Sequence, residues 1–326
     1  MTGREATGEA AGDAAGSGGS GSGRGPEGPS PDGEGPGLTL VLGGGGFKGL
    51  AHLGVLTVLE EERLPVERVV GTSVGALIGG AWCALGGARQ TTAAVDAFLA
   101  SEGLQGRGLV GFRRREGRVP LMRRVLAGIR RQVALERIFR RNSALGGQAV
   151  RLIVRHLLPP VDVADVGRPL AVCALDLVSG EPVVITRGDL RTAVTGSSAV
   201  PGFFPPVEWA GSLICDAGIV DNRPVAAGRE LAVGPVVAVD LSGGLAPLRP
   251  DATGLELLLR AQEVSTRLAN RRRAAQADLV LRPDLGGRHW LDSSHLPQVV
   301  EAGAAAVRDA LPALRALLEP PARRAV

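Results

Sequence analysis

The 326-residue sequence is poor in aromatic residues and contains no tyrosine. Aromatic residues make up 3% of the chain, although Lys and Arg outnumber Asp and Glu and the formal net charge is +4. Proteins that bind nucleic acids through stacked bases need aromatic side chains beside their basic residues. We therefore expect no nucleic-acid partner.

Cysteine is also scarce, and the three thiols, Cys83, Cys173 and Cys215, lie in apolar segments without a C-x-x-C spacing. This pattern excludes a disulfide framework and a cysteine-based zinc site. It is typical of buried, reduced thiols in a cytosolic protein. We expect neither a metal nor a cofactor.

Long apolar runs are missing as well. A membrane-spanning helix needs about 18 or more consecutive apolar residues. The amino terminus also lacks the charged start and apolar core of a secretion signal. The sequence therefore predicts a cytoplasmic protein that associates at most peripherally with the inner face of the membrane.

The composition divides the chain into three parts. Residues 1–37 consist mainly of small residues, Pro and Glu, which cannot bury enough apolar surface to offset the entropy of ordering, so we expect a disordered tail. Residues 38–318 contain no linker and no internal repeat, and we expect them to form one domain. A short tail, residues 319–326, follows.

Within residues 38–318, short apolar runs alternate with helical stretches, which predicts a mixed α/β fold. Two strand-to-helix units follow each other at the start, so we expect a parallel sheet with right-handed crossovers. The expected strands cover residues 38–42, 66–71, 170–177, 181–187, 212–216, 236–241 and 277–281, and the third and fourth of them form a hairpin. The expected helices cover residues 50–61, 74–85, 93–100, 189–195, 254–268 and 298–318.

The stretch Gly71-Thr72-Ser73-Val74-Gly75 lies where an expected strand meets an expected helix. A serine in G-x-S-x-G at such a junction sits on a strained turn that exposes its hydroxyl, and the flanking glycines remove side chains that would clash. The helix that begins at Val74 directs its free N–H groups toward any oxyanion formed at Ser73. The pattern favours a nucleophilic serine, although Gly and Ser also form ordinary turns.

A second glycine-rich turn, Gly43 to Gly49, follows the first expected strand. Glycines leave backbone N–H groups uncovered and able to approach a substrate carbonyl, as an oxyanion hole requires. The turn also holds Lys48, the sole lysine of the chain. Its ammonium either orients the loop, meets a headgroup charge or is a surface cation on the first helical turn.

Either a histidine or a carboxylate could act as the base for Ser73. The chain has four histidines, His52, His156, His289 and His295. The last two do not follow an acid as the α/β-hydrolase order requires, and His52 is expected to be a packed or capping side chain. Asp216 ends an apolar strand and precedes the small residues Ala217 and Gly218, so its carboxylate can project into a site.

These motifs resemble those of the patatin-like phospholipase family. Gly44-Gly45-Gly46-Phe47-Lys48-Gly49 resembles its oxyanion loop, Gly71-Thr72-Ser73-Val74-Gly75 its nucleophile elbow, and Asp216-Ala217-Gly218 its acid motif. Residues 198–206 and 222–224 resemble the family segments before and after that acid. All five motifs occur in family order between residue 38 and about residue 241.

The resemblance implies a three-layer fold whose central, mostly parallel sheet is flanked by helices. It implies a serine lipid acyl hydrolase of the phospholipase A or lysophospholipase type that cleaves a phospholipid or another acyl-ester lipid. Ser73 would be the nucleophile and Asp216 the base of a Ser-Asp dyad without histidine. The dyad requires a partly desolvated Asp216, which the apolar residues before it favour. Lys48 and Ala217 depart from the family, which more often has Arg and Gly there.

Residues 113–155 combine clustered arginines with apolar residues and are expected to be helical. The arginines either lie on the solvated faces of helices that cover the sheet or form a lid that rests on anionic lipid headgroups.

Two other functions stay open. A catalytically silent adaptor on the same fold would use residues 113–155 as a membrane surface, but the intact Ser73 and Asp216 argue against it. A nucleotide-binding module would need an acid at the end of the second strand or a G-K-[S/T] ending of the first loop, and both are missing.

Overall fold

The computed structural model describes residues 37–101, 143, 146–245, 247–248, 250–273 and 276–319. The chain divides into two units, Met1–Glu34 and Gly35–Val326, and every described residue lies in the second. The tails expected at 1–37 and 319–326 lie almost entirely outside the described residues. Most of the arginine-rich segment 113–155 lies outside them as well.

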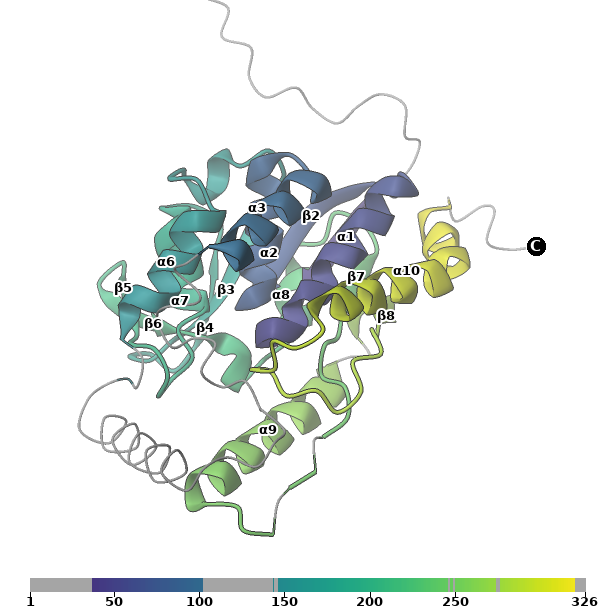
Figure 1. Cartoon of the computed structure of the whole chain (residues 1–326). Helices are drawn as coiled ribbons and strands as arrows, with labels where there is room; N and C mark the ends of the chain where they lie inside the picture. Colours follow the sequence, from purple (N-terminus) through teal and green to yellow (C-terminus); the bar gives the residue numbers. More distant parts are fainter. Residues whose placement is uncertain are drawn as a thin grey trace, which may run out of the picture. The chain divides into compact units, whose positions relative to one another are not determined.

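The described strands form one eight-stranded sheet in the order β5-β6-β3-β2-β1-β7-β8, with β4 also paired to β3 (Figure 1). Parallel pairings join β3, β2, β1, β7 and β8, and antiparallel pairings join β4 and β6 to β3 and β5 to β6. The strands are β1 (Leu38–Leu42), β2 (Val66–Thr72), β3 (Leu170–Asp176), β4 (Pro182–Ile185), β5 (Val207–Trp209), β6 (Ser212–Cys215), β7 (Val236–Val239) and β8 (Leu279–Leu281). The expected parallel sheet and the β3–β4 hairpin are confirmed.

Helices flank this sheet as expected. They are α1 (Ala51–Glu61), α2 (Val74–Leu85), α3 (Ala88–Ala100), α6 (Gly147–Leu157), α7 (Leu190–Ser197), α8 (Val225–Glu230), α9 (Gly254–Arg273) and α10 (Leu296–Leu318). Short 3-10 turns, η1 (Gly46–Leu50), η2 (Val163–Asp165) and η3 (Ala217–Ile219), also occur. Sequence patterns did not predict α8 or β5, and α7 ends two residues later than the expected helix 189–195.

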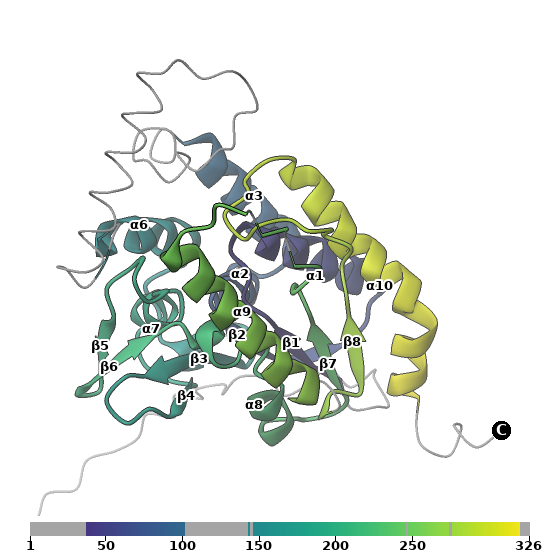
Figure 2. The same cartoon turned by 90° about the horizontal axis from the view of Figure 1, so that it is seen from below.

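Alternation along the strands divides the core between the two faces of the sheet. In β1, Leu38, Leu40 and Leu42 join the large core that includes α1, α2 and α10, whereas Val41 faces a smaller core with Val225 of α8. Figure 2 shows α8 on the opposite side of the sheet from α1 and α10. A helix, sheet and helix layering results, with the larger core on one side.

The strand register brings the expected serine and acid motifs to one place. Thr72 of β2 pairs with Cys173 of β3, and Leu175 of β3 pairs with Cys215 of the antiparallel strand β6. The residues that follow Thr72 and Cys215 therefore both lie beside the middle of β3. These residues are Ser73 and Asp216. Among the described helices, none is both long and apolar enough to cross a membrane.

Candidate active site

Ser73 occupies a strained turn between β2 and α2. Its backbone has φ 56° and ψ −124°, a region that a residue with a Cβ rarely adopts, and the expected strain at this turn is therefore present. Both flanking positions require glycine, because neighbouring backbone atoms lie too close for a side chain. A Cβ on Gly71 would lie 2.6 Å from the Ala76 nitrogen, and one on Gly75 would lie 2.1 Å from the Leu42 oxygen.

A residue that sequence reasoning missed holds this turn. The Ser73 N–H donates to the Ser197 hydroxyl oxygen at 2.8 Å, and the Ser197 hydroxyl donates to the Cys173 carbonyl at 2.6 Å. Ser197 is fully buried. Ser197 therefore links the end of α7 both to the serine turn and to β3, through the backbone of Ser73 and not its hydroxyl.

Asp216 directly follows β6 and is 4% exposed. Burial raises the pKa of its carboxyl to about 6, while hydrogen bonds from the Ser73 side chain and the Gly218 N–H act in the opposite direction. The Gly218 N–H lies 2.7 Å from Asp216 Oδ1. The structure thus brings the carboxylate and the serine hydroxyl together in an apolar setting.

The histidines lie elsewhere, and none of the four, all of which the structure describes, hydrogen-bonds Ser73. His52 is fully buried and its Nε2 contacts the Gly43 carbonyl at 2.8 Å. Burial lowers the pKa of His52 to about 4, so the ring is neutral at physiological pH and Nε2 donates. His52 is a packed side chain that supports the glycine loop.

The glycine loop lies against Ser73. A Cβ on Gly44 would lie 3.2 Å from the Ser73 Cβ, so the two backbones are close. Several loop amides already have acceptors: the Gly44 N–H donates to the Asn222 carbonyl, and the Phe47 N–H donates to the Trp290 carbonyl. Within the described part of the chain, the N–H groups of Gly45 and Gly46 have no such acceptor. These two amides are the available donors of the loop.

Asn222 joins the glycine loop to the acid motif. Its Nδ2 donates to the Gly44 carbonyl at 2.9 Å, and its own carbonyl accepts the Gly44 N–H at 2.9 Å. A Cβ on Gly218 would lie 2.9 Å from Asn222 Oδ1 and also 2.9 Å from Asp216 Oδ1. The Asn222 side chain therefore fills the space between the glycine loop and Asp216. In the sequence, the only sign of this residue was its place in the family-like segment 222–224.

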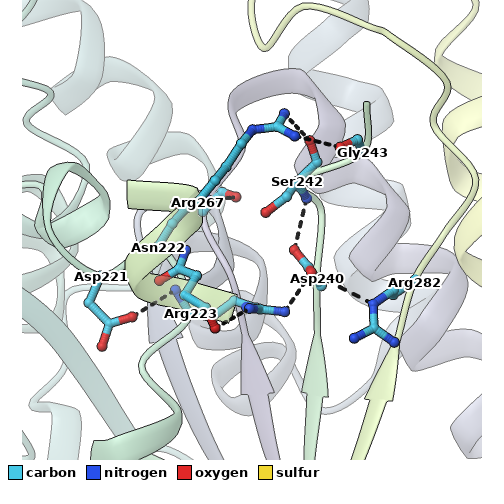
Figure 3. Close-up of polar contacts among 10 residues, drawn as sticks. Asp221, Asn222, Arg223, Asp240, Ser242, Gly243, Arg267 and Arg282 are labelled. Carbon is cyan, nitrogen blue, oxygen red and sulfur yellow. Dashed lines mark hydrogen bonds and ion pairs between the residues drawn. The ribbon is translucent and has the colours of Figure 1, made fainter. Parts of the chain in front are cut away.

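A buried ion pair fixes the turn that carries Asn222. The guanidinium of Arg223, a residue that is 4% exposed, pairs with Asp240 at the end of β7 and donates to the Asn270 carbonyl of α9 at 2.8 Å. Figure 3 shows Arg223 pointing from this turn toward Asp240, beside Asn222. Removing one partner of such a pair typically destabilises a protein by about 3–5 kcal/mol.

Lys48 is buried, so the alternative of a surface cation is wrong. It is 8% exposed, and burial together with nearby Arg267 lowers its pKa, whereas Glu263 and Asp240 raise it.

Beside the loop, the ring of Trp290 meets that of Phe203 edge to face, with centroids 5.2 Å apart. This aromatic pair provides an apolar wall next to the loop.

The three cysteines are free and buried, and burial raises the pKa of each thiol to about 12. They are therefore protonated at neutral pH, which confirms the expectation of buried thiols. Among the described residues, no group of three or more His, Cys, Asp or Glu side chains could hold a metal ion.

Comparison with known proteins places these motifs in one family. A sequence model of the family described as "Patatin-like phospholipase" matches residues 40–228. An uncharacterised NTE family protein of Mycobacterium tuberculosis is 28% identical over 303 residues, which cover 86% of this chain and 47% of that protein. The chain spans about half the length of the curated relatives that it matches over most of its own length.

Relatives with named activities match over smaller shares of their length. Lysophospholipase NTE1 of Mycosarcoma maydis is 30% identical over 220 residues, which cover 68% of this chain and 10% of that protein. Among solved structures, VipD from Legionella pneumophila has a TM-score of 0.48 and 16% sequence identity, covering 87% of this chain and 67% of that chain.

Proposed function

The chain belongs to the patatin-like phospholipase family, and we propose that it is a serine lipid acyl hydrolase of the phospholipase A or lysophospholipase type. The observation that carries the proposal is the buried Asp216 carboxyl in contact with the hydroxyl of Ser73 on a strained turn. The relative named lysophospholipase and the Drosophila melanogaster protein named neuropathy target esterase support an ester of a lipid as the substrate.

In the proposed first step, the Asp216 carboxylate takes the proton of the Ser73 hydroxyl while Oγ attacks the ester carbonyl. The carbonyl oxygen becomes negative and accepts from the N–H groups of Gly45 and Gly46 and from the start of α2. The tetrahedral intermediate collapses when the alcohol of the lipid leaves with the proton held by Asp216. An acyl ester on Ser73 results.

In the second step, Asp216 takes a proton from water, and the hydroxide oxygen attacks the acyl carbonyl. The oxyanion again accepts from the Gly45 and Gly46 amides. Collapse releases the fatty acid, and the proton returns from Asp216 to Ser73. A single carboxyl thus serves as base and acid in both halves of the cycle, which suits a pKa near neutrality.

The raised pKa of Asp216 predicts an acid-side loss of activity. Because the base must be ionised, kcat/KM for p-nitrophenyl butyrate is expected to fall about tenfold per pH unit below the Asp216 pKa of about 6 and to level off near pH 7. A pH series at constant ionic strength, with folding checked by circular dichroism at each pH, measures this. An inflection near pH 4 would contradict a desolvated base.

Asn222 is expected to position the oxyanion donors. Asn222→Ala removes the side-chain hydrogen bond to the Gly44 carbonyl and leaves the backbone bond, so kcat should fall about 10- to 100-fold with KM nearly unchanged. Thr57→Ala is the matched control, because the Thr57 hydroxyl also donates to a backbone carbonyl, that of Leu53, within α1. Equal losses of kcat in both variants would refute the positioning role.

Fatty-acid release from defined lipids tests the proposed function. Purified full-length protein is expected to release fatty acid from lysophosphatidylcholine or phosphatidylcholine, and Ser73→Ala protein is expected to release none above background. If wild-type and variant protein release equal amounts, the chain does not hydrolyse lipid esters through this site.

We also propose that residues 113–155 contact anionic lipid, on the strength of their clustered arginines alone. Such contact would make the protein peripheral to the membrane. Binding through this segment should weaken steeply as salt is raised.

A further inference from the structure

Several polar side chains of the helix α9 face the protein. Thr266 and Asn270 are buried, and the Thr266 hydroxyl donates to the Ile219 carbonyl of η3 at 2.9 Å. On the same side, Arg267 donates to the Gly243 carbonyl at 2.7 Å, after strand β7 (Figure 3). A carbonyl next to the acid motif and another beyond β7 thus hold the inward face of the helix.

The opposite face of α9 is apolar and largely exposed, with Val264 partly buried. Leu257, Ala261, Val264 and Leu268 recur at intervals of four, three and four residues and therefore lie on one stripe, with Leu258 beside it. Leu257 is 49% exposed, Leu258 66% and Leu268 54%. We call these five residues the α9 apolar face.

This arrangement is the reverse of a helix that lies between a protein core and water. A water-facing surface helix normally buries its apolar stripe and exposes its charged residues. Leu245 and Leu248, which precede α9, are also 44% and 46% exposed. An exposed apolar stripe of this kind marks a contact with a membrane or another partner.

The position of α9 indicates what kind of partner contacts its apolar face. The helix contacts η3, which begins directly after Asp216, and its Asn270 carbonyl holds Arg223 next to Asn222. Figure 2 shows α9 running diagonally in front of the sheet. Beside the apolar stripe lies the exposed Arg271, one turn beyond Leu268. Leucines edged by arginine are typical of helices that lie in the interface of an anionic membrane.

We propose that the α9 apolar face inserts into the surface of the lipid bilayer that holds the substrate. The inference rests on the proposed function, because an acyl hydrolase must draw a lipid from that surface to Ser73. A helix anchored to the acid motif by its polar face would hold the site against the bilayer. Insertion would extend about 5–10 Å, to the boundary between headgroups and acyl chains.

Vesicle binding by the full-length protein tests the proposal without relying on catalysis. The vesicles contain equal parts of ether-linked phosphatidylcholine and phosphatidylglycerol, which have no carboxylic ester to cleave. The test variant is Leu257→Gln with Leu258→Gln, because Gln keeps the helix propensity of Leu. The matched control is Leu177→Gln with Val178→Gln at the β3–β4 turn, where the two side chains are 48% and 72% exposed.

The α9 variant is expected to bind vesicles about 10- to 100-fold more weakly than the wild type, since two half-exposed leucines lose their transfer to lipid. The control variant should bind within about twofold of the wild type, as expected for surface substitutions elsewhere. On separate vesicles of the corresponding ester-linked lipids, hydrolysis should fall with binding, whereas turnover of p-nitrophenyl butyrate in water should not change. If the wild type binds vesicles but hydrolyses no substrate, the proposed function is contradicted, whereas the membrane contact of the α9 apolar face is still supported.

Several results would overturn the membrane contact. Unchanged vesicle binding by the α9 variant, or an equal loss by the control, would show that this face does not insert. A wild-type dimer that the α9 variant converts to a monomer would assign the face to a second copy of the chain. A fall in melting temperature of several degrees without loss of binding would show that another part of the chain covers it.

Discussion

Replacing Ser73 with alanine is expected to reduce turnover of any ester substrate by about 10⁴-fold or more, because removal of the nucleophile in serine hydrolases has cost about 10⁶-fold. The oxyanion donors and Asp216 remain, so substrate binding should persist. Steady-state kinetics with p-nitrophenyl butyrate measure the loss. Residual activity within tenfold of the wild type would mean that another residue attacks the ester.

The matched variant Ser73→Gly separates catalysis from backbone strain. Ser73 has φ 56°, which strains any residue that carries a Cβ, including alanine, but not glycine. Both variants should be inactive. The free energy of unfolding of Ser73→Gly should nevertheless be about 1 kcal/mol higher than that of Ser73→Ala, so the glycine variant is the more stable. Equal stabilities in urea titrations would show that the turn does not store strain.

Replacing Asp216 with asparagine is expected to lower kcat by about 10³- to 10⁴-fold, because an amide cannot take the proton of Ser73. The amide oxygen can still accept from the Gly218 N–H, so the turn after β6 should keep its shape. The same substitution should raise the stability of the protein at neutral pH. Loss of activity together with gained stability is typical of a site that keeps a charge in an unfavourable setting.

The sign of the stability change follows from the direction of the pKa shift. The Asp216 carboxyl has a pKa of about 6 in the folded protein against an ordinary value of 3.8, so the folded state holds the proton more tightly. The contribution of this carboxyl to stability is then most favourable below about pH 4 and falls by about 3 kcal/mol as the pH rises through 6. Asparagine does not ionise and removes this loss.

The difference in unfolding free energy between Asp216→Asn and the wild type should therefore be small at pH 4 and grow to a plateau near pH 7. Asp96→Asn serves as the control, because Asp96 is exposed on α3. That control should show no growth with pH. A variant less stable than the wild type at pH 7 would contradict the desolvation of Asp216.

Sequence patterns predicted the parts of the fold that local residues determine. The apolar run Leu38–Leu42 and the serine turn after Thr72 were placed correctly, because alternation of strand and helix is encoded within each segment. The six-residue helix α8 and the three-residue strand β5 were missed, since segments so short carry no detectable period. Their formation depends on the sheet that they contact.

In the candidate site, too, the residues within local motifs were predicted and those that depend on contacts between distant segments were not. Ser73 and Asp216 were identified from motifs, and their roles stay predictions. Ser197 and Trp290 were not identified, because they contact the serine turn and the glycine loop from distant parts of the chain. The burial of Lys48 also depends on α9, whose Arg267 and Glu263 lie near it.

The orientation of α9 could not have been predicted either. Residues 254–268 carry a helical pattern, and the usual rule would turn the leucines inward. Hydrogen bonds to the carbonyls of Ile219 and Gly243 reverse that orientation, and neither acceptor has a sequence signal because every residue has a carbonyl.

Labelling with a fluorophosphonate probe, followed by peptide mass analysis, tests the central claim most directly. The probe forms a covalent adduct with a serine only when that serine is activated as a nucleophile. We expect one adduct, on the peptide that contains Ser73, with labelling strongly slowed in Asp216→Asn protein and absent in Ser73→Ala protein. An adduct on another residue, or equal labelling of wild-type and Ser73→Ala protein, would contradict the account.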